Sequence, residues 1–238
     1  MPLDQQIHAS RALSQSLLHV VRDVSRTCGV EDTQRRRAIV LADLITPDHV
    51  RAYARHMADT FDLVYVTDEE QGLKEEIRKA VRMVMPSVDI DNYLSQWAFT
   101  VDRLIWLPYS LEKPRHEPRA PLAFQMMTLA HEATHRLQAK GQFQPFAWDY
   151  LTNEESRGQY EYEAYRVSLE LNPVFYGGAQ VAIDTLVSPL KHYGLSEATI
   201  AFVRQQLVMA ADIVQRGGVI GATSKETIYW LAQNVGTV

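Results

Sequence analysis

The feature that most constrains this chain is a pair of histidines four residues apart, His131 and His135, within the segment 120–140. On an α-helix this spacing places both side chains on one face, one turn apart. Two neutral imidazoles in this arrangement can bind one Zn²⁺ ion at roughly 2.0–2.1 Å. Glu132 directly follows the first histidine, so its carboxylate can accept a proton from a water that the metal holds. The segment therefore predicts part of a zinc site and a general base.

The residues around this motif favour one uninterrupted helix. Pro121 suits a first turn, where its missing N–H is not needed, and 122–140 contain neither glycine nor proline. Gly141 follows as the expected stop. Apolar residues recur at steps of three and four, which gives the helix a buried side: Leu122, Met126, Leu129, Ala130, Ala133 and Leu137.

The rest of the chain is predicted to be mostly helical, with few strands. Hydrophobic periodicity and capping residues predict helices over 5–26, 31–44, 47–59, 68–85, 89–97, 154–171, 181–187, 196–215 and 224–235. Strands are expected over 61–66 and 99–107; a loop over 112–119 and an aromatic connection over 142–153 flank the motif helix. The fold class is therefore α+β, mostly α with a small sheet, and the absence of repeats or linkers predicts a single domain over 1–238.

Composition narrows the classes of function. The 238 residues carry a net charge of −5, with a pI of about 5.9, and Arg35–Arg37 is the only basic cluster, so no nucleic-acid partner is expected. Cys28 is the only cysteine, which excludes an internal disulfide and a cysteine-rich zinc site. The first residues lack the apolar core of a secretory signal, and no stretch reaches the roughly 18 apolar residues of a membrane helix. The sequence predicts a cytoplasmic protein without a membrane partner and does not define its oligomeric state.

A catalytic zinc site needs a third protein ligand and an open position for water. Without a cysteine cluster, this ligand should be a carboxylate or a histidine from another element. The helix expected over 154–171 offers five carboxylates: Glu154, Glu155, Glu161, Glu163 and Glu170. Glu161 and Glu163 lie about equally close to the apolar stripe of that helix, so burial does not separate them.

A more specific pattern appears in this helix, where Glu161 and Ala164 form E-x-x-A downstream of H-E-x-x-H. The combination resembles the gluzincins, the glutamate-type zinc metallopeptidases, and implies that Glu161 is the third zinc ligand. The next position is often Asp or Asn in that family, whereas this chain has Tyr165, whose hydroxyl could bond an imidazole or a zinc-bound oxygen. Glu163 remains an alternative ligand, as does Glu155, which matches an N-E element of longer, thermolysin-like members.

The resemblance covers the segment from His131 to Glu170, and the single domain is expected to have three portions. A zincin-like metal-site core is expected over 61–172, with an N-terminal helical portion over 1–60 and a C-terminal helical portion over 173–238. The expected strand over 99–107 is similar to the edge strand that precedes the motif helix in many zincins and binds the substrate backbone there.

The implied function is zinc-dependent hydrolysis of a peptide or protein substrate. Glu132 would act as the general base, and Tyr165 is a catalytic candidate. Tyr165, Tyr160 and His192 are the candidate donors to a developing oxyanion. The alternative is a catalytically silent zincin-like protein that serves as a binding or structural component.

Overall fold

The structure is mostly helical with one small sheet, as predicted. This computed structural model describes residues 41–67, 97–111, 121–139, 142–177 and 183–235, together with isolated positions between 75 and 95. The predictions for 5–26 and 112–119, and most of those for 31–44, 68–85 and 89–97, lie outside the described residues. The described helices are α2 (Leu41–Leu44), α3 (Pro47–Phe61), α6 (Leu122–Ala139), α7 (Phe143–Thr152), α8 (Glu154–Tyr176), α9 (Ile183–Val187), the 3₁₀ helix η1 (Ser188–Tyr193), α10 (Glu197–Gln215) and α11 (Ala222–Asn234).

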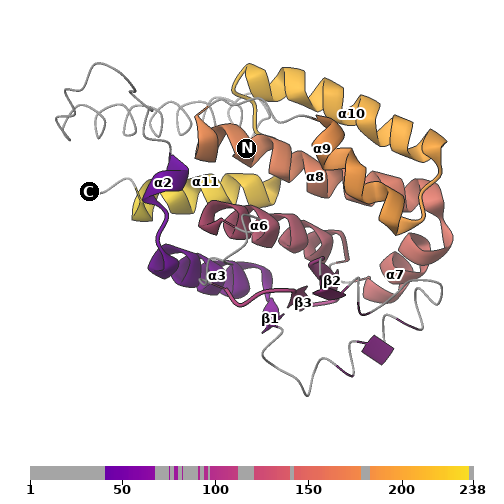
Figure 1. Cartoon of the computed structure of the whole chain (residues 1–238), viewed down its shortest axis with the longest axis horizontal. Helices are drawn as coiled ribbons and strands as arrows, with labels where there is room; N and C mark the ends of the chain where they lie inside the picture. The colour runs from indigo at the N-terminus through magenta and orange to yellow at the C-terminus, as the bar shows by residue number, and fades with distance from the viewer. Residues whose placement is uncertain are drawn as a thin grey trace.

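Four helices form a stack, in the order α10, α8, α6 and α3 from the top to the bottom of Figure 1. The larger hydrophobic core joins α3, α6, α11 and the sheet, and it includes Val167 and Leu171 of α8. A smaller core joins α8 to η1 and α10 and includes Tyr165 and Leu169. Because α8 contributes to both cores, its orientation against α6 is fixed from two sides.

The start of α3 follows from its first residues. The Thr46 hydroxyl accepts a hydrogen bond from the His49 backbone N–H, and the His49 ring accepts one from the Thr46 N–H, both at 3.2 Å. Pro47 occupies the first turn, as the sequence predicts. The helix ends at Phe61, and the next residue, Asp62, has a left-handed backbone with φ of 55°. The following strand therefore begins at Val64 rather than at residue 61.

The sheet corrects one prediction, because the expected strand over 99–107 is a hairpin. Its strands β2 (Phe99–Val101) and β3 (Leu104–Leu107) pair antiparallel, while β1 (Val64–Thr67) pairs parallel with β3. Among the described strands the order is β1-β3-β2, so β2 is an outer strand of this set. Asp102 makes the turn with a φ of 54°, a conformation that aspartate tolerates better than most residues. Its carboxylate accepts a 2.8 Å hydrogen bond from Arg136, which ties the hairpin to α6.

Two further predictions fail near the motif helix. The aromatic connection expected over 142–153 contains a ten-residue helix, α7. The helix α8 does not stop at residue 171 but continues through Pro173 to Tyr176. Proline removes one backbone donor, yet Leu171 and Phe175 on either side of it are fully buried, and this burial outweighs the lost hydrogen bond. Gly177 ends the helix with a φ of 71°.

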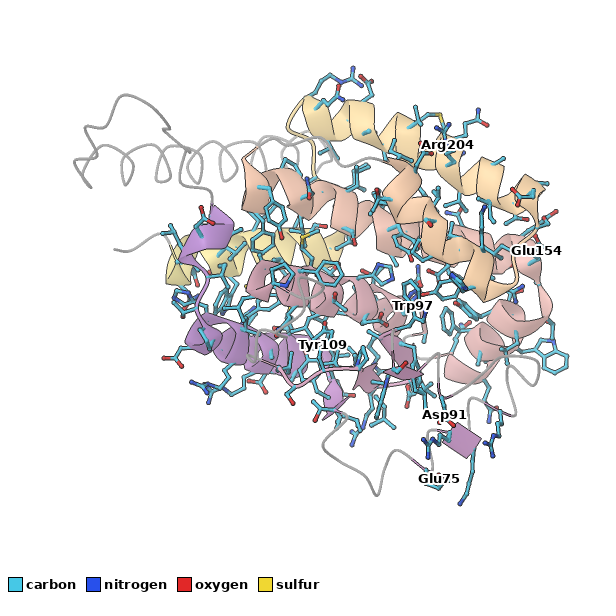
Figure 2. The ribbon with its side chains drawn as sticks, in the orientation of Figure 1. Glu75, Asp91, Trp97, Tyr109, Glu154 and Arg204 are labelled. Carbon is cyan, nitrogen blue, oxygen red and sulfur yellow. The ribbon has the colours of Figure 1, made fainter. Side chains whose placement is uncertain are left out.

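The C-terminal helices agree with the prediction to within a few residues, except that 188–193 form η1. Ser196 caps α10 through a 3.3 Å hydrogen bond from the Thr199 N–H. Glu154, at the first position of α8, accepts hydrogen bonds from the Ser196 N–H at 2.6 Å and the Thr199 hydroxyl at 2.5 Å, and so joins the starts of α8 and α10 (Figure 2). Within the described residues, no helix is long and apolar enough to cross a membrane.

Candidate metal centre

The packing of α6 against α8 brings three sequence-predicted residues together. His131 and His135 lie on the buried face of α6, with exposures of 9% and 8%, and their ring centroids are 5.2 Å apart. Glu161 faces them from α8 and is 1% exposed. One nitrogen of each histidine and one oxygen of Glu161 lie within 4.8 Å of one another, so the three residues could hold a metal ion.

The carboxylate of Glu161 has the geometry of a ligand. Its Oε1 lies 3.6 Å from His135 Nε2, close to the roughly 3.4 Å that separates two ligand atoms around a tetrahedral Zn²⁺. Tyr150 donates a 2.6 Å hydrogen bond to the same oxygen. The other oxygen, Oε2, is buried and has no hydrogen-bond partner. A buried carboxylate is costly, and a cation bound between it and the two imidazoles would offset that cost. The residues present therefore fit a metal.

Hydrogen bonds orient both imidazoles. His135 Nδ1 lies 2.8 Å from Gln138 Oε1, an acceptor, so Nδ1 carries the proton and the lone pair of Nε2 faces the cluster. His131 bonds the backbone of Ala164 on α8. Burial, followed by the nearby His135, holds the pKa of His131 well below its usual range. His131 is therefore neutral, which is the form that binds a metal.

Glu132 is 4% exposed and lies next to the cluster. The Thr100 hydroxyl on β2 donates a 2.7 Å hydrogen bond to its Oε2. Burial raises the pKa of Glu132 to about 7; nearby His135 and the Thr100 hydrogen bond oppose this rise, and the charge of Glu161 adds to it. The hydrogen bond fixes one carboxylate oxygen and ties the motif helix to β2.

The two alternative ligands lie elsewhere. Glu163 binds the amides of Gln138 at 2.9 Å and Gln159 at 3.2 Å, so it supports His135 only through Gln138. Glu155 is exposed in the first turn of α8, where Asn153 caps its N–H. Of the three candidate carboxylates, Glu161 is the one that lies with His131 and His135 in the group that could hold a metal ion.

The predicted oxyanion donors are distributed around the site. The ring of Tyr165 packs edge-on against His131, with centroids 4.8 Å apart. The hydroxyl of Tyr160 is directed to Asp149 Oδ2, at 3.0 Å. His192 is exposed in η1 rather than in a loop, and its ring lies 5.7 Å from that of Trp97. Among the three, Tyr165 is the residue that contacts a member of the cluster.

Three residues of the site were not predicted from the sequence: Thr100, Gln138 and Tyr150. Gln138 follows His135 by three positions, and this helical spacing is a signal that could have identified it. Thr100 and Tyr150 come from β2 and α7 and are recognisable only after the chain has folded.

Comparisons with protein-family models, curated proteins and solved structures found no match to this chain. The chemical interpretation therefore depends on the residues themselves. They comprise two imidazoles and one carboxylate that could hold a metal, with a second carboxylate beside them.

Proposed function

We propose that this chain is a zinc-dependent peptidase with a zincin-like core, in which His131, His135 and Glu161 hold Zn²⁺. The observation that carries the proposal is the buried carboxylate of Glu161, one oxygen of which lies within 4.8 Å of a nitrogen of each histidine. When bound, the metal would acidify a coordinated water and polarise the carbonyl of the scissile peptide bond.

The donor set favours zinc over other common metals. Two imidazoles and one carboxylate suit Zn²⁺, whereas Mg²⁺ and Ca²⁺ prefer oxygen ligands alone. Three protein ligands also match a catalytic rather than a structural site, because structural zinc sites are closed by four. The absence of a cysteine cluster in the sequence is consistent with this assignment.

Glu132 is the general base in this proposal. It accepts the proton of the attacking water and passes it to the leaving amine. Thr100 holds its Oε2 at 2.7 Å, which leaves Oε1 to take part in the proton transfer. Tyr165 packs against His131 and holds that imidazole in place.

The position of β2 supports a peptide as the substrate. Among the described strands β2 is an outer one, and its Thr100 bonds the proposed general base directly. A substrate strand that paired with β2 would lie next to Glu132 and the metal ligands. Figure 1 shows β2 beside the end of α6, between β3 and α7.

The test separates metal binding from chemistry. Glu132→Gln should bind zinc in the wild-type ratio and lose hydrolysis of a peptide library, whereas His131→Ala should lose the metal. Glu155→Gln, which alters an exposed carboxylate of α8, is the matched control and should retain both. Undiminished hydrolysis by Glu132→Gln would remove the assigned base. Stoichiometric zinc without cleavage of any peptide by the wild type would favour the silent binding or structural protein.

A further inference from the structure

Tyr150 is the residue of α7 that reaches the metal-ligand cluster. Its hydroxyl lies 2.6 Å from Glu161 Oε1, and its ring centroid lies 6.3 Å from that of His135. We propose that Tyr150 is a positioning residue of this centre, which sets the orientation of the Glu161 carboxylate through that hydrogen bond. The inference rests on the proposed metal centre and adds a residue outside both of its sequence motifs.

The direction of the hydrogen bond follows from chemistry. An ionised carboxylate can only accept, so the tyrosine hydroxyl is the donor. Such charge-assisted hydrogen bonds are short and strong, and this one fixes the rotation of the carboxylate about its last bond. With Oε1 held by Tyr150, the oxygen that lies 3.6 Å from His135 Nε2 keeps its place in the cluster, because the carboxylate cannot rotate without losing the hydrogen bond. A donor on one oxygen therefore favours coordination through a single, defined geometry.

Contacts to residues outside the metal-ligand cluster hold Tyr150 in place. Its ring stacks on that of Tyr160 at an interplanar angle of 14°, with Phe146 against it at 5.9 Å. The backbone carbonyl of Tyr150 accepts a 2.9 Å hydrogen bond from Arg157 on α8. The hydroxyl of Tyr160 in turn bonds Asp149 of α7. These contacts fasten α7 to α8, so the hydroxyl of Tyr150 reaches Glu161 at little further cost in side-chain entropy.

A role in packing alone makes a different prediction. The ring contacts of Tyr150 would survive replacement by phenylalanine, whereas its hydrogen bond to Glu161 would be lost. Tyr160 supplies a matched control, because it belongs to the same ring cluster but donates its hydroxyl to Asp149 rather than to Glu161.

The experiment compares Tyr150→Phe with Tyr160→Phe in the full chain. Zinc affinity is measured by competition with a chromophoric chelator, and the ligand field by the visible spectrum of the Co²⁺-loaded protein. We expect Tyr150→Phe to weaken zinc binding by about 10–100-fold, the usual effect of losing a partner of a metal ligand, and to shift the Co²⁺ bands. Tyr160→Phe should leave both near wild type, and far-ultraviolet circular dichroism of the zinc-free proteins should be unchanged.

A double-mutant cycle tests whether Tyr150 acts through Glu161. In a Glu161→Gln background, Tyr150→Phe should have little further effect on the residual metal affinity. Unchanged zinc affinity and Co²⁺ bands in Tyr150→Phe would overturn the inference, as would equal losses in the two phenylalanine variants. A wild-type protein that binds zinc but cleaves no peptide would remove the proposed hydrolysis and leave this inference standing. A wild-type protein that binds no zinc would overturn both.

Discussion

Replacement of Glu161 by glutamine tests the metal centre most directly. The variant keeps the size of the side chain and an acceptor for Tyr150, and it removes the negative charge of the proposed ligand. Glu161 is 1% exposed and faces His135 at 3.6 Å, so no solvent-exposed side chain can readily take its place. Loss of a ligand should weaken zinc binding at least as much as loss of a ligand's hydrogen-bond partner, which costs about 10–100-fold.

This loss translates into a measurable difference in stability. At a free zinc concentration 100 times the wild-type Kd, binding stabilises the folded protein by about 2.7 kcal/mol. A variant that binds 100-fold more weakly gains about 0.4 kcal/mol at the same concentration. For a domain of this size, each kcal/mol shifts the melting temperature by about 2–4 °C. Zinc should therefore raise the melting temperature of the wild type by about 5–11 °C, and that of a Glu161→Gln protein with a 100-fold loss of affinity by about 1–2 °C.

The assay is thermal unfolding of each protein with excess zinc and with a chelator. Glu155→Gln, on the exposed first turn of the same helix, should show the full wild-type shift. Glu163→Gln should show a reduced shift, because Glu163 supports His135 through Gln138. A full zinc-induced shift in Glu161→Gln would refute the ligand assignment, and its loss in Glu163→Gln alone would transfer the role to Glu163.

Three further variants test the contacts around the centre. Thr100→Val removes the 2.7 Å hydrogen bond to Glu132 and should lower kcat while zinc affinity, measured by titration, stays unchanged. Hydrogen bonds lower the pKa of Glu154 to about 2 from its usual 4.5. The ionised Glu154 carboxylate therefore stabilises the fold above about pH 4.5, and this contribution is lost as the pH falls through 2. We expect the urea midpoint of Glu154→Gln to lie below that of the wild type at pH 7 and to approach the wild-type midpoint in acid. Gly158→Ala would place a Cβ 2.5 Å from Thr199 Cγ2. The clash should lower the free energy of unfolding by about 1–3 kcal/mol, despite the higher helix propensity of alanine. Equal stability of the variant and the wild type in urea would show that α10 moves to accommodate the methyl group.

The elements that the sequence predicts well carry their own local signals. The capping residues Thr46 and Pro47 mark the start of α3, and the periodic apolar side of α6 marks that helix. The hairpin of β2 and β3 was missed because its turn contains neither glycine nor proline. The turn residue Asp102 lies within a run that is otherwise rich in strand-forming residues, so the run resembles one continuous strand. The helix α7 was missed because Pro145 and several aromatic residues favour an irregular connection.

The candidate site likewise contains residues that the sequence of one helix predicts and residues that only the packing of several elements brings together. The spacing of His131 and His135 is a property of one helix, so it could be read before folding. Thr100 and Tyr150 join the site through contacts 32 and 11 residues away along the chain, to Glu132 and Glu161. Such contacts depend on how whole elements pack, and the sequence of neither partner specifies them.

The choice between Glu161 and Glu163 shows what packing decides. Side chains two residues apart on a helix point in directions about 200° apart. The rotation of α8 about its axis therefore determines whether Glu161 or Glu163 faces His135. The buried position of Val167 in the larger core and of Leu169 in the smaller one sets that rotation. Both glutamates then act on the same imidazole: Glu161 lies at Nε2, and Glu163 holds Gln138, which bonds Nδ1. The two carboxylates that sequence reasoning treated as rivals are therefore partners, one facing the proposed metal and the other fixing the tautomer that lets His135 bind it.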